Sequence, residues 1–212
     1  MKTCIIFCAA GFDGLLGPIP EAALTIAADG GLRHTHALGI TPDVILGDFD
    51  SLGYVPEDSR VYPVEKDDTD AMLAVRLGLE RGCTEFYLYG AMDGPRLDHT
   101  MANFQTLAFL AEHHARGWLI GRDYIATVAS RETLSFSEEN TGILSCFCLG
   151  SDITDLTIRG LKYPLSHGTL RSAFPLGVSN HFTGQPGEIT VGDGLLLVLW
   201  DRSCGICART ML

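Results

Sequence analysis

Short apolar runs alternate with stretches of helical periodicity over roughly the first 124 residues, and this rhythm constrains the fold more than any other feature. The apolar runs predict strands at residues 3–9, 24–28, 44–46, 60–64, 85–89 and 118–120. Apolar residues at helical spacing predict helices over residues 70–81 and 97–116. Strands that alternate with helices are typical of a parallel sheet with crossover helices.

The pattern changes near Tyr124, after which the candidate strands are separated only by turn residues. These strands fall at residues 143–149, 153–158, 188–191 and 195–200, with Gly, Pro, Asn and Ser between them. The sequence therefore predicts an α/β domain over residues 1–124 and an all-β domain over residues 125–212, in close contact because no long linker joins them.

Charge and hydropathy narrow the class of protein. The net charge is −11, from 15 Lys and Arg against 26 Asp and Glu, which argues against a nucleic-acid partner. No apolar stretch approaches the roughly 18 residues of a membrane span, and the N-terminus lacks the core of a signal peptide. We expect a cytoplasmic protein without a membrane partner.

Seven cysteines occur at irregular spacing, which is not typical of a secreted disulfide framework. Reduced thiols are therefore expected. Cys146, Cys148, Cys204 and Cys207 could in principle hold zinc, but Cys146 and Cys148 lie in an apolar strand-like run, so ordinary thiols are the better interpretation.

Acidic residues follow two of the predicted strands directly. Asp29 precedes two glycines, which let the backbone turn sharply or approach a ligand. Asp48 and Asp50 are separated by one residue, so in an extended segment both point to the same side and can hold one cation. Hard oxygen ligands at this spacing suit Mg²⁺.

A third acidic motif, Lys66-Asp67-Asp68-Thr69-Asp70, opens the first predicted helix. Thr69 or Asp68 can cap that helix, and acids in its first turn suit the helix dipole, so a purely structural role is an alternative for these aspartates. Lys66 could instead hold phosphates that a metal ion bridges.

The fourth motif, Arg96-Leu97-Asp98-His99, leads into the long helix. Arg96 offers a planar fork to phosphate, and Asp98 can accept hydrogen bonds from an amino group. His99 could be a capping or core residue as readily as a catalytic one. Carboxylates that meet at one strand edge would repel one another without a divalent cation, so the motifs together predict a metal ion and a polyphosphate ligand.

These segments, in this order, resemble the thiamine pyrophosphokinase family. The resemblance includes Ala28-Asp29-Gly30-Gly31, Pro42-Asp43, Gly47 to Ser51, Lys66 to Asp70 and Arg96 to His99, and it continues at Gly160 to Leu165 and Ser179-Asn180. It implies an N-terminal Rossmann-like catalytic domain that binds ATP, a C-terminal β-sandwich, and a homodimer whose thiamine site lies between the catalytic domain of one subunit and the β domain of the other.

The resemblance also implies roles for individual residues. Asp48, Asp50 and Asp70 become the Mg²⁺ and diphosphate group, and Asp29 lies close by. Lys66 and Arg96 become phosphate contacts. Asp98 joins the catalytic group and, with Ser179 and Asn180, becomes a candidate for holding thiamine.

The chain departs from the family pattern before Arg96, where a glycine pair is expected and Met92-Asp93-Gly94-Pro95 stands instead. Pro95 stiffens this loop and removes a backbone donor. Asp93 either disturbs the phosphate side or is simply solvated. Phe182 is a candidate for stacking on thiamine, and a core position is the alternative.

Two other functions are alternatives. One is diphosphate transfer to another hydroxymethyl heterocycle such as a pterin, since the acidic ATP side would look much the same. The other is a non-catalytic sensor that binds thiamine or a nucleotide.

Overall fold

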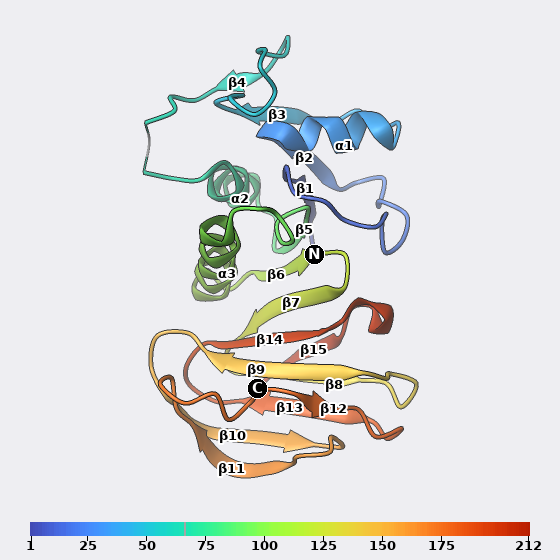
Figure 1. Cartoon of the computed structure of the whole chain (residues 1–212), viewed down its shortest axis with the longest axis vertical. Coiled ribbons are helices and arrows are strands. Elements are labelled where there is room, and N and C mark those ends of the chain that lie inside the picture. The colour runs from blue at the N-terminus through green and yellow to red at the C-terminus, as the bar shows by residue number, and fades with distance from the viewer. Residues whose placement is uncertain (66) are drawn as a thin grey trace. The chain divides into compact units, whose positions relative to one another are not determined.

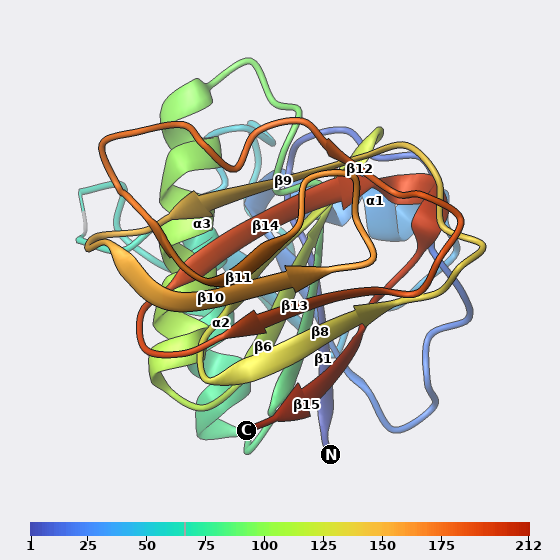
Figure 2. The same cartoon turned by 90° about the horizontal axis from the view of Figure 1, so that it is seen from below.

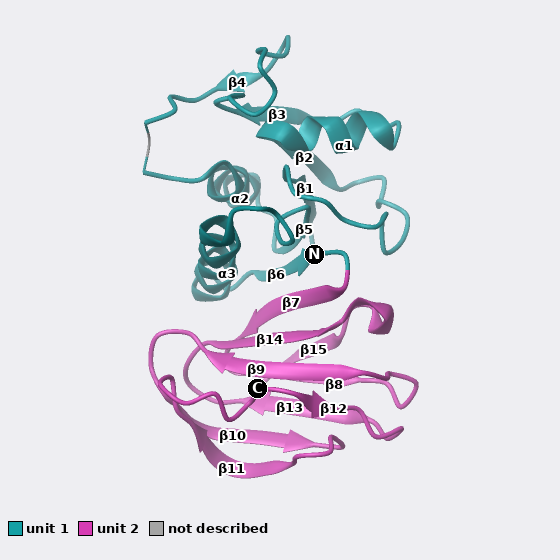
Figure 3. Ribbon diagram, viewed as in Figure 1, with its two compact units in different colours: residues 1–122 teal, residues 123–212 magenta. Residues whose placement is uncertain are grey.

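The computed structural model describes residues 1–65 and 67–212. The chain divides into two compact units, residues 1–122 and residues 123–212 (Figure 3). Among the described residues, no helix combines the length and the apolar character that crossing a bilayer would require.

The first unit is built on a parallel sheet in the order β6-β5-β1-β2-β3-β4 (Figure 1). Its strands are β1 (Thr3–Phe7), β2 (Leu24–Ala28), β3 (Val44–Gly47), β4 (Arg60–Val61), β5 (Glu85–Tyr89) and β6 (Arg116–Ile120). β1 lies between β2 and β5, so the chain first builds the sheet outward to β4 and then returns to the other side of β1. The crevice at such a reversal is where open α/β sheets bind ligands.

Helices cover both faces of this sheet. They are α1 (Leu32–Ala37), α2 (Asp70–Glu80) and α3 (Leu97–Glu112), and a 3-10 turn, η1 (Asp29–Gly31), precedes α1. α2 and α3 pack on one face and α1 lies on the other (Figures 1 and 2). With both faces covered, the inner strand β2 is buried along its whole length, and four of its five residues are apolar.

The predicted helices are confirmed, and their ends were less predictable. α3 stops at Glu112, earlier than the predicted residue 116, because Arg116 already pairs with Glu85 as the first residue of β6. His114 takes a φ of 56° in the connecting turn. Pairing with a neighbouring strand therefore fixed a boundary that helical periodicity left open.

The second unit consists of two antiparallel sheets, in the orders β12-β9-β14-β7 and β11-β10-β13-β8-β15. The strands are β7 (Tyr124–Ala129), β8 (Glu132–Phe136), β9 (Ile143–Cys148), β10 (Ile153–Arg159), β11 (Leu165–Leu170), β12 (Asn180–His181), β13 (Gly187–Val191), β14 (Leu196–Asp201) and β15 (Ala208–Met211). A second 3-10 turn, η2 (Arg202–Cys204), follows β14.

The two sheets of this unit pack face to face as a sandwich. The ring of Trp200 in β14 meets that of Phe136 in β8 edge-on, with 5.4 Å between the centroids, and Trp200 is fully buried. Its indole N–H donates a hydrogen bond of 2.8 Å to the Gly205 carbonyl, which satisfies the one polar group that this large side chain buries. The predicted fold class, α/β followed by a β-sandwich, is confirmed.

Candidate active site

A pocket of about 570 Å³ lies at the carboxyl edge of the parallel sheet in the first unit. Residues that follow β1, β2, β3 and β5 form its wall, together with the first turns of α2 and α3. The lining includes these predicted site residues: Asp29, Asp48, Asp50, Asp70 and Arg96. Acids separated widely in the sequence meet here because parallel strands bring their carboxyl ends to one edge.

Asp29 is the most buried acid of the pocket, at 9% exposure. It follows β2 directly and has a φ of 47°, in the left-handed region that few side chains adopt. Its Oδ2 accepts a hydrogen bond of 2.5 Å from the hydroxyl of Ser51. Its Oδ1 is buried and has no hydrogen-bond partner among the described residues. A buried carboxylate oxygen without a partner is costly, so this atom points to a ligand beyond the residues that the structure describes.

Asp48 and Asp50 follow β3 and complete a three-carboxylate cluster. Asp29, Asp48 and Asp50 each offer an oxygen, and the three oxygens lie within 4.8 Å of one another. Phe49, between the two acids, is buried at 2% exposure, as predicted, but its φ of 61° shows that this segment turns and is not extended as expected. Gly47, the last residue of β3, allows β3 to lie close to Asp29, because a Cβ at position 47 would lie 3.1 Å from the backbone of Asp29.

The cluster fits a hard divalent cation. Like charges at this spacing repel by several kcal/mol even at the effective dielectric of about 20 that suits protein sites, so a counter-charge stabilises the arrangement. The ligands are all carboxylate oxygens, which Mg²⁺ prefers. Sequence reasoning grouped Asp48 and Asp50 with Asp70 and placed Asp29 nearby. The structure gathers Asp29 into the cluster and places Asp70 on the pocket wall, at the first residue of α2.

Cys8, directly after β1, also lines the pocket. Burial raises the pKa of its thiol to about 12, with further contributions from the charges of Asp70 and Asp29. The pocket therefore presents a neutral thiol there rather than a thiolate.

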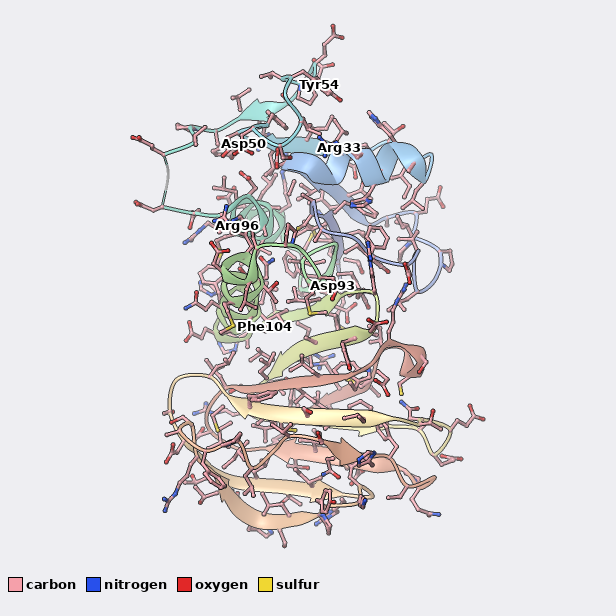
Figure 4. The ribbon with its side chains drawn as sticks, in the orientation of Figure 1. Arg33, Asp50, Tyr54, Asp93, Arg96 and Phe104 are labelled. Carbon is pink, nitrogen blue, oxygen red and sulfur yellow. The ribbon has the colours of Figure 1, made fainter. Side chains whose placement is uncertain are left out.

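Arg96 is the cation that the described part of the pocket wall supplies. Its guanidinium donates hydrogen bonds to Asp98 from Nε, at 3.0 and 3.3 Å to the two carboxylate oxygens, and from Nη2, at 2.5 Å. This pairing holds the pKa of Asp98 at about 2, well below its usual value. The hydrogen bond to Asp98 also raises the pKa of Arg96, and the charge of Asp50 contributes, so Arg96 lies within electrostatic reach of the cluster. Figure 4 labels both Arg96 and Asp50.

The helix that begins at Asp70 is capped by Thr69, whose hydroxyl accepts a hydrogen bond of 3.2 Å from the N–H of Met72. Asp68 forms an ion pair of 3.0 Å with Arg76, one and a half turns into α2. Thr69 is therefore the cap of this helix, and Asp68 pairs with Arg76 and also lines the pocket. The predicted phosphate contact of Lys66 lies outside the described residues.

Further polar residues shape the pocket, and sequence reasoning gave them no role. Asn103 in α3 donates a hydrogen bond of 2.7 Å to the Ala91 carbonyl and so fixes the start of the loop after β5. Ser51 holds Asp29, as described above. The sequence signal for Ser51 was its place directly after the acid pair, but a hydroxyl in a loop has too many potential partners for the sequence to identify the one it binds.

Asp43, in contrast, is not among the residues that line the pocket. It accepts two hydrogen bonds of 2.7 Å from Thr25.

The predicted thiamine contacts Ser179 and Asn180 belong to the second unit. The Asn180 side chain accepts hydrogen bonds of 2.9 Å from the N–H groups of Tyr163 and His181, and donates one of 2.8 Å to the Tyr163 carbonyl. The ring of Phe182 packs against that of Phe136, with 5.4 Å between the ring centroids. Through these contacts Asn180 and Phe182 help to stabilise this unit. Their contact with thiamine stays a prediction.

The cysteines of the second unit are free thiols. Cys148 donates to the Leu170 carbonyl at 3.1 Å, and Cys204 donates to the Thr141 carbonyl at 3.2 Å. Each of these two sulfurs is thus engaged with its own backbone partner.

Comparison with known proteins agrees with this geometry. The family model for the catalytic domain of thiamin pyrophosphokinase matches residues 18–119, and the model for its vitamin B1 binding domain matches residues 131–196. A thiamine pyrophosphokinase of Bacillus subtilis is 29% identical over 197 residues, which are 87% of this chain and 90% of the relative.

Solved structures give the same result. The B. subtilis thiamine pyrophosphokinase superposes with a TM-score of 0.78 at 27% identity, covering 94% of this chain and 98% of that one. The thiamin pyrophosphokinase of Geobacillus thermodenitrificans gives a TM-score of 0.75 at 25% identity, with 96% and 100% covered. Since the two family models together span most of both units, the chain belongs to the thiamine pyrophosphokinase family.

Proposed function

We propose that this chain transfers the β,γ-diphosphate of ATP to the hydroxyethyl hydroxyl of thiamine, releasing AMP. The observation that carries the proposal is the carboxylate cluster at the carboxyl edge of the sheet, with a buried oxygen of Asp29 that has no partner among the described residues. The cluster lies within the stretch that the catalytic-domain family model matches.

Asp29, Asp48 and Asp50 would hold Mg²⁺, and Asp70 is proposed to complete the group from the start of α2. Mg²⁺, when bound, supplies charge neutralisation for the phosphate oxygens of ATP. Transfer of this kind depends mainly on positioning and electrostatic stabilisation, so the chain needs no unusually strong base.

Arg96 contributes a planar set of donors to the diphosphate as charge builds up on it. In the described structure this guanidinium, at the pocket wall, is hydrogen-bonded to Asp98. Lys66 is proposed as a second phosphate contact. Asp98, ionised because its pKa is held at about 2, is an acceptor suited to the thiamine amino group.

The second unit carries the stretch that the vitamin B1 binding family model matches, and this stretch includes Ser179 and Asn180. We assign these two residues to thiamine recognition. We also propose that the protein acts as a homodimer in the cytoplasm.

A coupled assay for AMP tests the function. With thiamine, ATP and MgCl₂, AMP and thiamine diphosphate should accumulate in equal amounts, and omission of either thiamine or MgCl₂ should abolish both products. Replacement of thiamine by 6-hydroxymethyl-dihydropterin should give no AMP. AMP formation with the pterin alone would instead identify the alternative acceptor, and saturable thiamine binding without AMP would identify a sensor.

A further inference from the structure

Ser51 makes the closest polar contact to the buried acid of the pocket. Its hydroxyl donates to Asp29 Oδ2 at 2.5 Å, a length typical of a hydroxyl that donates to an ionised carboxylate. The contact leaves Oδ1, the other oxygen of the same carboxylate, buried and without a partner among the described residues. One oxygen is thus occupied by the protein and the other is left for a ligand.

The backbone around Asp29 is arranged to allow this contact. A Cβ on Gly30 would lie 2.8 Å from the Ser51 hydroxyl oxygen and 2.9 Å from the Cβ of Ala9, so a larger residue at position 30 would push the hydroxyl away. Asp29 itself adopts a left-handed φ of 47°, a conformation that aspartate adopts more often than most residues with a side chain. An orphaned buried carboxylate oxygen is typical of a position that binds a ligand.

A second residue holds Ser51 from outside the pocket. Arg33, an exposed residue of α1, donates a hydrogen bond from Nη2 to the Ser51 carbonyl. Figure 4 labels Arg33 on α1 and Asp50 on the neighbouring loop. This loop also bends back on itself, because the N–H groups of Leu52 and Gly53 both donate to the Phe49 carbonyl at 3.2 Å. The carbonyl of Ser51 is therefore fixed by the helix and its hydroxyl is fixed by Asp29.

We propose that Ser51 is a positioning residue for the cation site and that Arg33 anchors it. By occupying Oδ2, Ser51 fixes the rotation of the Asp29 carboxylate and presents Oδ1 to the cation that the Asp29, Asp48 and Asp50 cluster binds. Arg33 keeps the loop that carries Asp48, Asp50 and Ser51 at the correct distance. The identification of the cation with the Mg²⁺ of diphosphate transfer rests on the proposed function, whereas the positioning itself does not.

The test is cation affinity, measured with Mn²⁺ alone by electron paramagnetic resonance on the full chain without ATP or thiamine. Removal of a hydrogen bond that orients a metal ligand typically weakens metal binding by about 10- to 100-fold, and this range is expected for Ser51→Ala. Ser51→Thr keeps the hydroxyl and should restore most of the affinity. Arg33→Gln should weaken binding to a smaller degree, because the hydroxyl of Ser51 remains.

Ser59→Ala is the matched control. Ser59 lies in the next turn of the chain and donates its hydroxyl to the Pro56 carbonyl at 2.7 Å, so its loss removes a hydroxyl without touching the cluster. Its Mn²⁺ affinity should equal that of the unmodified protein. In the AMP assay, Ser51→Ala should need more Mg²⁺ for half its maximal rate, and the rate should recover at saturating Mg²⁺.

The outcomes separate this inference from the proposed function. If the unmodified protein binds Mn²⁺ and Ser51→Ala binds it weakly, the positioning role stands even when no AMP forms from thiamine and ATP. If Ser51→Ala binds Mn²⁺ as tightly as the unmodified protein, the positioning role is wrong, whatever the activity. No measurable Mn²⁺ binding by the unmodified protein would also overturn it.

Discussion

The carboxylate of Asp93 accepts a hydrogen bond of 2.7 Å from the backbone N–H of Arg122. This contact ties the loop that follows β5 to the end of β6, and it is possible because Gly121 has no Cβ, which would lie 2.4 Å from Asp93 Oδ2. The sequence left two interpretations of Asp93, a disturbance of the phosphate side or a solvated charge. The structure shows a third, in which the acid anchors the loop that carries Arg96.

We expect Asp93→Ala to lower the free energy of unfolding by about 2 kcal/mol. About half of this is the lost hydrogen bond and about half is the cost of alanine at a φ of 61°. Asp93→Asn should cost less, because asparagine tolerates this φ and retains an acceptor oxygen. Urea unfolding of both variants measures the difference. Equal stability of Asp93→Ala and the unmodified protein would show that the anchor contributes nothing.

Asp50→Asn should abolish AMP release while the fold remains intact, because an amide weakens a cation site without changing its shape. The assay contains thiamine, ATP and MgCl₂, and circular dichroism checks the fold. Asp58→Asn is the matched control, since Asp58 is exposed, is not among the residues that line the pocket and has a φ of 55° that asparagine accepts. Normal turnover by Asp50→Asn would remove this residue from the mechanism.

Asn180→Ala should lower the free energy of unfolding by about 2 kcal/mol. The loss of its three hydrogen bonds leaves the backbone groups of Tyr163 and His181 without these partners in a largely buried place. Urea unfolding measures the change.

Ser179→Gly is the sharper probe of thiamine recognition. Ser179 has a φ of 61°, which glycine accepts without strain, so the variant should keep its stability and raise KM for thiamine. An unchanged KM would exclude the Ser179 side chain from the thiamine contact.

The ion pair between Arg209 in β15 and Glu132 in β8 is buried, with side-chain exposures of 2% and 3%. Glu132→Leu should destabilise the protein by about 3–5 kcal/mol, because it leaves the arginine charge buried without its carboxylate. The double variant Glu132→Leu, Arg209→Met should recover most of this loss, since two apolar residues leave no buried charge. A double-mutant cycle in urea measures the coupling. Additive losses would show that the pair is not coupled.

Burial raises the pKa of the Cys146 thiol from 9.0 to about 12, and the nearby Cys148 adds to the shift. Below pH 9 the thiol is protonated in both states, so it adds no pH dependence. Between pH 9 and 12 the unfolded chain loses this proton and the folded protein keeps it, so stability falls as pH rises, by at most about 1.4 kcal/mol per pH unit. Cys146→Ala should therefore show a shallower alkaline loss of stability than the unmodified protein, relative to its own value at pH 7. Identical slopes in urea titrations from pH 8 to 11 would contradict this cause.

The sequence by itself predicted that acids from several strands meet at one edge of the parallel sheet. Periodicity located the strands of the first unit and its helices α2 and α3, but not α1, and a parallel arrangement sends the carboxyl ends of all strands to one edge. Asp29, Asp48 and Asp50 follow β2 and β3 directly, so their convergence needed no knowledge of side-chain geometry. The change to turn-separated strands likewise predicted the all-β second unit.

Only the tertiary structure decided how these acids are held. The hydrogen bond between Ser51 and Asp29 joins residues 22 positions apart, and the one between Arg122 and Asp93 joins residues 29 positions apart. The tertiary structure likewise decided that Asp29 belongs to the carboxylate cluster and that Asp70 lies on the wall of the pocket. Periodicity reports which face of a strand or helix a side chain occupies, whereas a hydrogen-bond partner depends on how distant loops fold over one another. The hydrogen-bond partners of these acids are therefore known only from the folded structure.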